Sequence, residues 1–149
     1  MEGISLFTAQ HKPTTSERSD IVDFLFYELG EYGDSKEAIS KAIAFALKET
    51  PKSIGGFILS FRDPNKKILG AAVINETGMT DYIPENILVY IAVSQDRRGQ
   101  GLGKQLMVKV QETVKGDIAL HIDPQNPARH LYERMGFTQP YLEMRYKAE

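Results

Sequence analysis

The stretch Val89–Met107, VYIAVSQDRRGQGLGKQLM, joins an apolar run to a helical pattern through a loop with three alternating glycines. Glycine lets a backbone turn sharply or lie close to a ligand. Because Gly99, Gly101 and Gly103 carry no side chains, the N–H groups of the loop stay uncovered. At the N-terminus of a helix such donors add to the positive end of the helix dipole. The stretch therefore predicts an anion site, above all for phosphate or pyrophosphate.

The same loop does not match the two commonest phosphate-binding motifs. Arg97, Arg98 and Lys104 add positive charge beside the glycines. A dinucleotide fingerprint counted from Gly99 would need glycine where Lys104 stands. A P-loop would need glycine in place of Arg98, and serine or threonine in place of Gln105. These mismatches disfavour a nucleotide-binding protein of another fold.

Composition narrows the class of protein. The 149 residues are 42% hydrophobic, which predicts one domain over residues 1–149. The chain has no cysteine, so no disulfide, cysteine metal site or thiol nucleophile is available, and we expect no metal. The net charge of -2 argues against nucleic-acid binding. No apolar run is long enough to span a membrane, and the start of the chain lacks a secretion signal. We expect a soluble, cytoplasmic protein.

Periodicity and turn signals give the order of elements. The first half predicts a strand at 4–9, a helix at 14–33 and a second helix at 34–50, opened by Asp34 or Ser35. Apolar positions of the helices recur at helical spacing, namely Ile21, Val22, Leu25, Phe26 and Leu29, then Ile39, Ile43 and Leu47. Strands at 57–61 and 68–74 flank the turn DPNKK and predict an antiparallel hairpin.

The second half predicts a crossover. A buried strand at 87–93 leads to a helix that begins near Gly101 and to a strand at 118–122. A short helix at 128–135 ends at Gly136, and residues 137–148 look like strands. The order predicts an α/β (α+β) fold with a mixed, mostly antiparallel sheet and one parallel strand–helix–strand crossover.

Two motifs resemble those of the GNAT-type N-acetyltransferase superfamily. The first is IAVSQDRRGQGLGKQLM, in which Arg98, Gly101 and Gly103 fill the positions of that family's acyl-CoA motif. The second is NPARHLYERMGF, residues 126–137, which resembles the family's asparagine, Leu-Tyr and Gly-Phe pattern. The predicted order of elements is also similar to the family's fold.

The resemblance implies acetyl-CoA as the acetyl donor. Backbone groups of Ile91, Ala92 and Val93 would then pair with the pantetheine arm. The pyrophosphate would be held by N–H groups of the loop, whose residues are Arg98, Gly99, Gln100, Gly101, Leu102, Gly103 and Lys104. Counted from the preceding strand, Asn126 falls on the family's asparagine. Counted back from Leu131 and Tyr132, Gln125 falls on it instead. Either residue is therefore a candidate to face the cofactor.

The resemblance also implies catalytic candidates for direct attack of an amine on the thioester. Tyr132 matches the family's tyrosine, which commonly points at the CoA sulfur and would act as the acid. His121 and Glu85 are candidate bases, since each lies near a position where relatives carry a carboxylate base. A water relay is the alternative to both. Each of these residues also has a purely structural interpretation. Tyr132 would then pack in the core, His121 would support the strand, and Glu85 would be a solvated acid of the loop.

The sequence says least about the acceptor substrate. In this family the first two helices and the loop at 75–86 shape the acceptor site. Here they carry many acids, which would attract a cationic amine or simply be solvated. The aromatic set Phe24, Phe26, Tyr27, Tyr32 and Tyr82 could line a pocket, and Glu76, Asp81 and Tyr82 could contact substrate. We expect a small-molecule or protein amine as acceptor, possible homodimer formation, and, as the alternative function, a non-catalytic acyl-CoA sensor or carrier.

Overall fold

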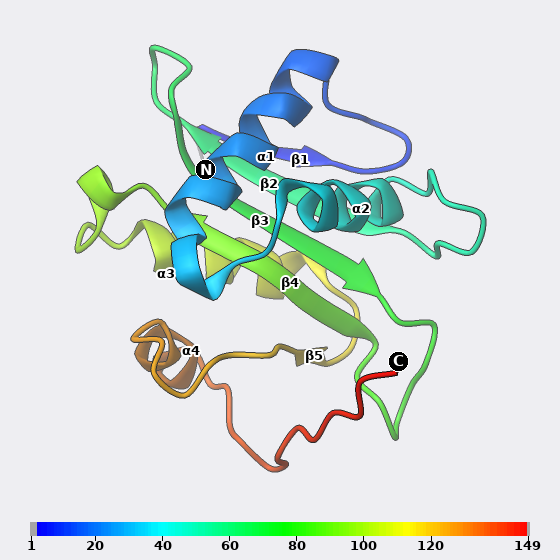
Figure 1. Cartoon of the computed structure of the whole chain (residues 1–149). Coiled ribbons are helices and arrows are strands. Elements are labelled where there is room, and N and C mark those ends of the chain that lie inside the picture. Colours follow the sequence, from blue (N-terminus) through cyan, green and yellow to red (C-terminus); the bar gives the residue numbers. More distant parts are fainter. Residues whose placement is uncertain (1–2, 149) are drawn as a thin grey trace.

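The structure is a computed structural model that describes residues 3–148, and its centre is a five-stranded sheet in the order β1-β2-β3-β4-β5. Neighbouring strands from β1 to β4 pair antiparallel, whereas β4 and β5 pair parallel. The strands are β1 (Ile4–Phe7), β2 (Gly56–Arg62), β3 (Ile68–Glu76), β4 (Asn86–Val93) and β5 (Ile118–Ala119). The predicted mixed sheet with one parallel crossover is confirmed (Figure 1).

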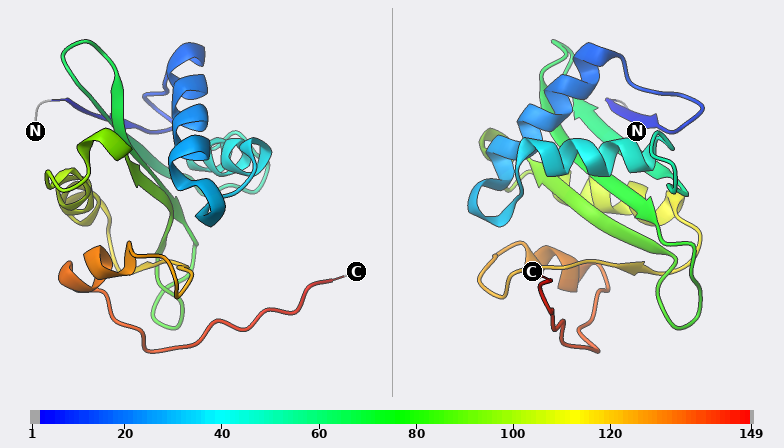
Figure 2. Two further views of the ribbon diagram at one scale, coloured as in Figure 1. Left: turned by 60° about the vertical axis from the view of Figure 1, so that its left-hand side comes forward. Right: turned by 45° about the vertical axis from the view of Figure 1, so that its right-hand side comes forward.

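Helices cover both faces of the sheet (Figure 2). They are α1 (Thr15–Leu29), α2 (Lys36–Ala46), α3 (Leu102–Thr113) and α4 (Arg129–Arg134), with 3-10 turns η1 (Gly30–Tyr32) and η2 (Gln95–Arg97). One apolar core lies between the sheet and α1 with α2, and a second lies between the sheet and α3 with α4. Among residues 3–148 there is no helix with the length and apolarity that crossing a bilayer demands.

Local capping explains where the first two helices begin. Thr14 and Glu17 form a capping box, in which the Glu17 N–H donates to Thr14 Oγ1 at 3.1 Å and the Thr14 N–H donates to Glu17 Oε1 at 2.8 Å. Helix α2 is capped by Ser35, whose Oγ accepts from the Ala38 N–H at 3.1 Å. Of the two caps that the sequence left open, Ser35 is therefore the one used.

The apolar faces predicted for α1 and α2 are buried at nearly every predicted position. Ile39, Ile43 and Leu47 are fully buried, as their spacing predicts. In α1 the prediction was wrong at one position, because Phe26 is 37% exposed while Phe24 is buried. Phe26 lies over the ammonium of Lys36 instead, 5.3 Å from ring centroid to Nζ.

Two predicted strands near the end of the chain are corrected by the structure. Strand β5 ends at Ala119 rather than at residue 122, since the chain then diverges from β4 and loses its pairing partner. Residues 137–148 contain no strand. The periodicity is present there, but a strand exists only where a neighbour supplies hydrogen bonds, and this segment lies outside the layers (Figure 2).

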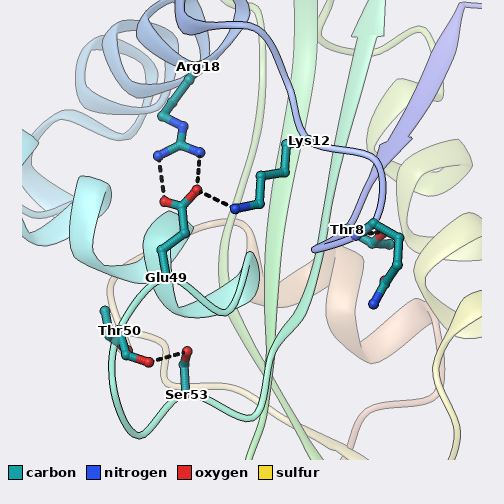
Figure 3. A network of polar contacts seen from close by, with 7 residues as sticks. Thr8, Lys12, Arg18, Glu49, Thr50 and Ser53 are labelled. Atoms are coloured by element: carbon teal, nitrogen blue, oxygen red, sulfur yellow. Dashed lines mark hydrogen bonds and ion pairs between the residues drawn. The ribbon is translucent and has the colours of Figure 1, made fainter.

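A carboxylate ties the start of α1 to the turn that follows α2 (Figure 3). Glu49 accepts two hydrogen bonds from the Arg18 guanidinium, at 2.7 and 2.8 Å, and one from Lys12 Nζ at 3.0 Å. These contacts, those from Arg18 first, lower the pKa of Glu49 from 4.5 to about 2. The contacts of Glu49 with Arg18 and Lys12 hold α1 and α2, which cover one face of the sheet, in place relative to each other.

We predict that Glu49→Gln lowers the free energy of unfolding by about 1 kcal/mol at neutral pH, since partly exposed pairs contribute little beyond that. Because folding lowers the pKa of Glu49, its stabilisation is complete above pH 4.5 and is lost as the pH falls towards about 2. Thermal unfolding of both proteins between pH 7 and pH 2 should therefore converge at low pH. Glu112→Gln, at an exposed position of α3, is the control and should change little. An equal gap at all pH values would contradict the assignment.

Candidate functional site

The centre of the candidate site is the place where β4 and β5 separate. They are paired only at Asn86 with Ile118 and at Ile87 with Ala119. Beyond Ile87 the β5 side of β4 has no strand partner among the described residues, and the chain after β5 moves away towards α4 (Figure 1). Since strand N–H and C=O groups alternate between the two sides, half of those between Leu88 and Val93 face this open side.

A bulge lies in the same part of β4. The pairing with β3 shifts so that Val73 faces Tyr90 and Ile74 faces Leu88, which leaves Val89 as an extra residue. A bulge bends its strand and re-aims the groups next to it. Ile91, Ala92 and Val93, the predicted partners of a pantetheine arm, follow directly, with Ile91 and Val93 only partly buried.

The glycine loop then presents a row of free donors. Helix α3 begins at Leu102, one residue after the predicted start, and Gly101 is its N-cap in a left-handed conformation without a capping side chain. Among residues 3–148, the backbone N–H groups from Gly99 to Lys104 have no protein acceptor; the first inward bond runs from the Gln105 N–H to the Gly101 carbonyl at 3.0 Å. Orphan donors at a helix start bind anions.

The three glycines have different tasks. Gly99 and Gly101 have φ of +82° and +79°, and an added Cβ at either would meet nothing within 4 Å. They are needed for the backbone conformation, and the space above them is open to a ligand. At Gly103 a Cβ would lie 3.1 Å from Leu131 Cδ2, so this glycine lets α3 pack closely against α4.

Charge around the loop is mainly positive. Among the described residues, neither Arg97 nor Lys104 has a carboxylate within ion-pair distance. Arg98 lies beside Glu28, with Nη2 3.8 Å from Oε1. The same Oε1 accepts from the Gln95 N–H at 3.0 Å, which anchors the start of the loop to α1. A depression of about 480 Å³ borders the loop at Arg97, and Gln100 and Leu102 also line it.

Tyr132 lies on α4 and belongs to the core formed with α3. Its ring meets that of Phe137 edge to face, with centroids 5.8 Å apart. Burial raises the pKa of Tyr132 to about 12. The phenol therefore stays protonated at neutral pH and can donate a hydrogen bond, and its hydroxyl has no protein partner among residues 3–148.

Glu85 precedes β4 and is occupied by structural contacts. Its Oε1 accepts from the Asp117 N–H at 2.8 Å, and its Oε2 accepts from Thr80 Oγ1 at 2.5 Å. These bonds, that from Thr80 first, lower the pKa of Glu85. Gly116 has φ of +92°, and a Cβ there would lie 2.5 Å from Glu85 Oε1. The carboxylate thus joins the loop before β4 to the turn before β5.

The remaining sequence candidates lie on the loop between β5 and α4. His121 is exposed and follows the end of β5. Asn126 Oδ1 accepts from the Ala128 N–H at 3.0 Å, which organises the turn into α4. The backbone carbonyl of Gln125 accepts from the Tyr32 hydroxyl at 3.2 Å, so this loop is held to the segment between α1 and α2.

One buried polar pair was missed by the sequence reasoning. Tyr90 on β4 is 8% exposed, and its hydroxyl donates to Asp34 Oδ2 at 2.6 Å. The alternation of β4 could have indicated an inward tyrosine, but no local signal pairs it with an acid so far away in the chain. Together with the hydrogen bond from Tyr32 to Gln125, the Tyr90–Asp34 bond holds the segment between α1 and α2 beside the open part of β4.

The aromatic and acidic residues expected at an acceptor site are not gathered in one place. Phe24 and Tyr27 line a depression of about 340 Å³ together with Asp20, Asp23 and Glu28, on the side of α1 next to Ser94. Tyr82, in contrast, is exposed on the loop before β4, away from that depression. Among the described residues, no group of three or more histidine, aspartate or glutamate side chains is arranged to hold a metal ion.

Comparison with solved structures finds the same fold in several proteins. A Pyrococcus furiosus protein described as an acetyl transferase superposes with a TM-score of 0.63 at 21% identity, covering 97% of this chain and 99% of that one. A transcriptional regulator from Bacillus halodurans C-125 superposes with a TM-score of 0.66 at 18% identity, with the same coverage of 97% and 99%. Identities this low establish the fold alone.

Sequence comparison adds a relative and a family. A "5-NmdU N-acetyltransferase" of Pseudomonas phage PaMx11 is 40% identical over 57 residues, which is 37% of this chain and 41% of that protein. The chain thus matches less than half the length of this relative. Residues 55–139, more than half of the chain, match the model of the acetyltransferase (GNAT) domain. Together with the sheet that divides at β4 and β5, this match shows that the chain belongs to the GNAT acetyltransferase family.

Proposed function

We propose that this protein transfers an acetyl group from acetyl-CoA to a primary amine by direct attack on the thioester. The observation that carries the proposal is the row of free N–H groups from Gly99 to Lys104 beside the open side of β4. An anion site and a strip of strand backbone lie next to each other, which suits a ligand that carries a pyrophosphate and an amide-bearing arm.

The two ends of acetyl-CoA would use these two features. Its pyrophosphate would accept from the loop N–H groups, with Arg97 and Lys104 supplying positive charge. Its pantetheine amides would pair with Ile91 and Val93 as an added strand would. The acetyl carbonyl would then lie against β4, where a backbone N–H can stabilise the negative charge that develops on its oxygen.

The reaction needs a neutral amine and a stabilised leaving group. The amine nitrogen forms a bond to the acetyl carbon, the C–S bond breaks, and the amine loses a proton. A lysine-like amine has a pKa of about 10.4, so that proton must be removed before or during attack. No covalent enzyme intermediate is required, in keeping with a chain that has no cysteine.

We assign Tyr132 to the leaving thiolate. A phenol with a pKa of about 12 is a weaker acid than a thiol, whose pKa is about 8.5. Tyr132 therefore stabilises the departing sulfur by donating a hydrogen bond, and the thiolate takes its proton from solvent. Its burial beside Phe137 would hold the hydroxyl in one direction during this step.

For the base we favour His121 or a water relay over Glu85. Both carboxylate oxygens of Glu85 already accept hydrogen bonds, and its lowered pKa makes it a weaker proton acceptor. His121 is exposed on the loop after β5, and a neutral imidazole there can accept a proton from the amine.

The acceptor is proposed as an amine on a small molecule or a protein. The name of the phage relative supports transfer to nitrogen, but the match covers too little of either chain to carry its acceptor over. The net charge of -2 disfavours a polynucleotide. Asp34, held by Tyr90 beside β4, could attract an ammonium group.

A ligand panel tests the proposal. Acetyl-CoA should raise the melting temperature whereas ATP and NAD should not, because a ligand that binds only the folded state stabilises it. With mixed amines, acetyl-CoA should release free thiol. In Gly101→Asp, a carboxylate within the anion site should abolish the thermal shift.

Gly136→Asp is the matched control for that variant. Gly136 also has a positive φ, +96°, and no atom within 4 Å of an added Cβ, but it lies after α4. It should keep the response to acetyl-CoA. No response of the unaltered protein to any CoA ester would refute the proposal, and binding without thiol release for any amine would favour a sensor.

Tyr132→Phe tests the role of the phenol. We expect kcat to fall by about 10- to 100-fold, with little change in acetyl-CoA affinity, because only the hydrogen bond to the developing thiolate is lost. The phenyl ring keeps the contact with Phe137, so the melting temperature should hold. Thiol release at saturating acetyl-CoA measures the effect, and an unchanged kcat would remove Tyr132 from the mechanism.

Glu85→Gln distinguishes a structural carboxylate from a base. If Glu85 acts only through Asp117 and Thr80, the variant should melt at lower temperature near pH 7 and keep most of its kcat. Because folding lowers the pKa of Glu85, the stability gap should close as the pH falls below 4.5. Thr80→Ala should shift stability in the same direction. A loss of kcat of about 100-fold without a loss of stability would instead identify Glu85 as the base.

A further inference from the structure

The carboxylate of Asp34 is oriented by a hydrogen bond but carries no counter-charge. Asp34 lies just before α2, is exposed, and accepts at Oδ2 from the Tyr90 hydroxyl at 2.6 Å. It does not cap α2, since Ser35 does. Among residues 3–148, no lysine, arginine or histidine nitrogen lies within ion-pair distance of Asp34, and nearby Lys36 is held by Asp23 at 3.0 Å instead. The negative charge and the second oxygen, Oδ1, are therefore available to a ligand.

Two hydrogen bonds place Asp34 over the point where β4 and β5 separate. Tyr90 directly precedes Ile91 on β4, and its side chain lies in the core between the sheet and α1 with α2. The Tyr32 hydroxyl donates to the Gln125 carbonyl at 3.2 Å, so the same segment reaches across to the loop after β5. Tyr132, in contrast, packs with α3 on the other face of the sheet (Figure 2). Asp34 and Tyr132 thus border the opening from opposite faces.

The chemistry of acetyl transfer decides which group a carboxylate at this place can bind. A carboxylate close to an ammonium group favours its charged form, whereas only a neutral amine can attack the thioester. Binding of the attacking nitrogen by Asp34 would therefore slow the transfer. A second basic group on the same acceptor has no such conflict, because it keeps its proton throughout the reaction. An oriented carboxylate can hold such a group by a charge-assisted hydrogen bond.

We propose that the acceptor is a small diamine, and that Asp34, positioned by Tyr90, binds its second ammonium group while the first amine attacks the thioester. This inference rests on the proposed function and names its substrate class. The phenol of Tyr90, which is 8% exposed, separates the carboxylate from β4, so a short chain of carbon atoms must separate the two amines. A monoamine lacks the contact with Asp34, and the site discriminates against it for that reason.

Calorimetry on the CoA-saturated protein tests the proposal without turnover. We expect 1,4-diaminobutane to bind about tenfold more tightly than n-butylamine, the size of effect that one hydrogen bond between charged groups supplies. Asp34→Asn keeps an oxygen that can accept from Tyr90 but removes the charge, so the two amines should then bind equally and the melting temperature should hold. Glu31→Gln, at an exposed position of η1, changes the net charge equally and should keep the preference. Failure of the diamine to bind, equal affinities in the unaltered protein, or a preference that survives Asp34→Asn would each overturn the proposal.

Steady-state thiol release separates this inference from the proposed function. Asp34→Asn should raise KM for 1,4-diaminobutane about tenfold, leave KM for n-butylamine unchanged, and keep the thermal shift with acetyl-CoA. Tyr90→Phe should raise KM for the diamine alone, because the carboxylate stays but is no longer oriented. If acetyl-CoA binds and n-butylamine releases thiol but the diamine is not preferred, the inference fails and the proposed function stands. If no CoA ester binds, the proposed function itself fails. A Tyr90→Phe variant with an unchanged preference would overturn the positioning role of Tyr90.

Discussion

The short parallel pairing of β4 and β5 is the constraint on which the rest of the site depends. The two strands are joined only at Asn86 and Ile87, where the Asn86 amide donates to the carbonyls of Lys115 and Asp117 at 2.8 and 3.2 Å. Glu85 adds its bond to the Asp117 N–H. These contacts hold the strands together at one end, so the bulged remainder of β4 keeps a free side along which a ligand can lie.

Packing around α3 determines what lies beside that free side. Gly103 allows α3 to approach α4, which brings the free N–H groups of the loop to the end of β4 and places Tyr132 on the same side. Glu28 on α1 holds the loop from the other face through the Gln95 N–H. The glycine loop, where we propose the anion site, is therefore held in place by both helical layers.

Much of this could be predicted because the signals are local. The start of α2 near Ser35, the hairpin around Asp63 and the alternating glycines each depend on a few neighbouring residues, whose backbone preferences decide the outcome. The alternating segment Tyr141–Lys147 shows the limit of such signals. Its alternation is that of a strand, but whether a strand forms depends on a neighbour that the local sequence does not specify.

The sequence by itself determined the order of elements, the helix starts to within a residue or two and the position of the glycine loop before α3, since these follow from periodicity, caps and glycine spacing. Only the tertiary structure decided that Glu85 is engaged with Thr80 and Asp117, that Tyr90 bonds to Asp34, and that Phe24 rather than Phe26 is buried. Each of these features depends on contacts between residues that are far apart in the sequence. The hydrogen-bond partners and the burial of a side chain are set by those contacts and not by its neighbours in the chain.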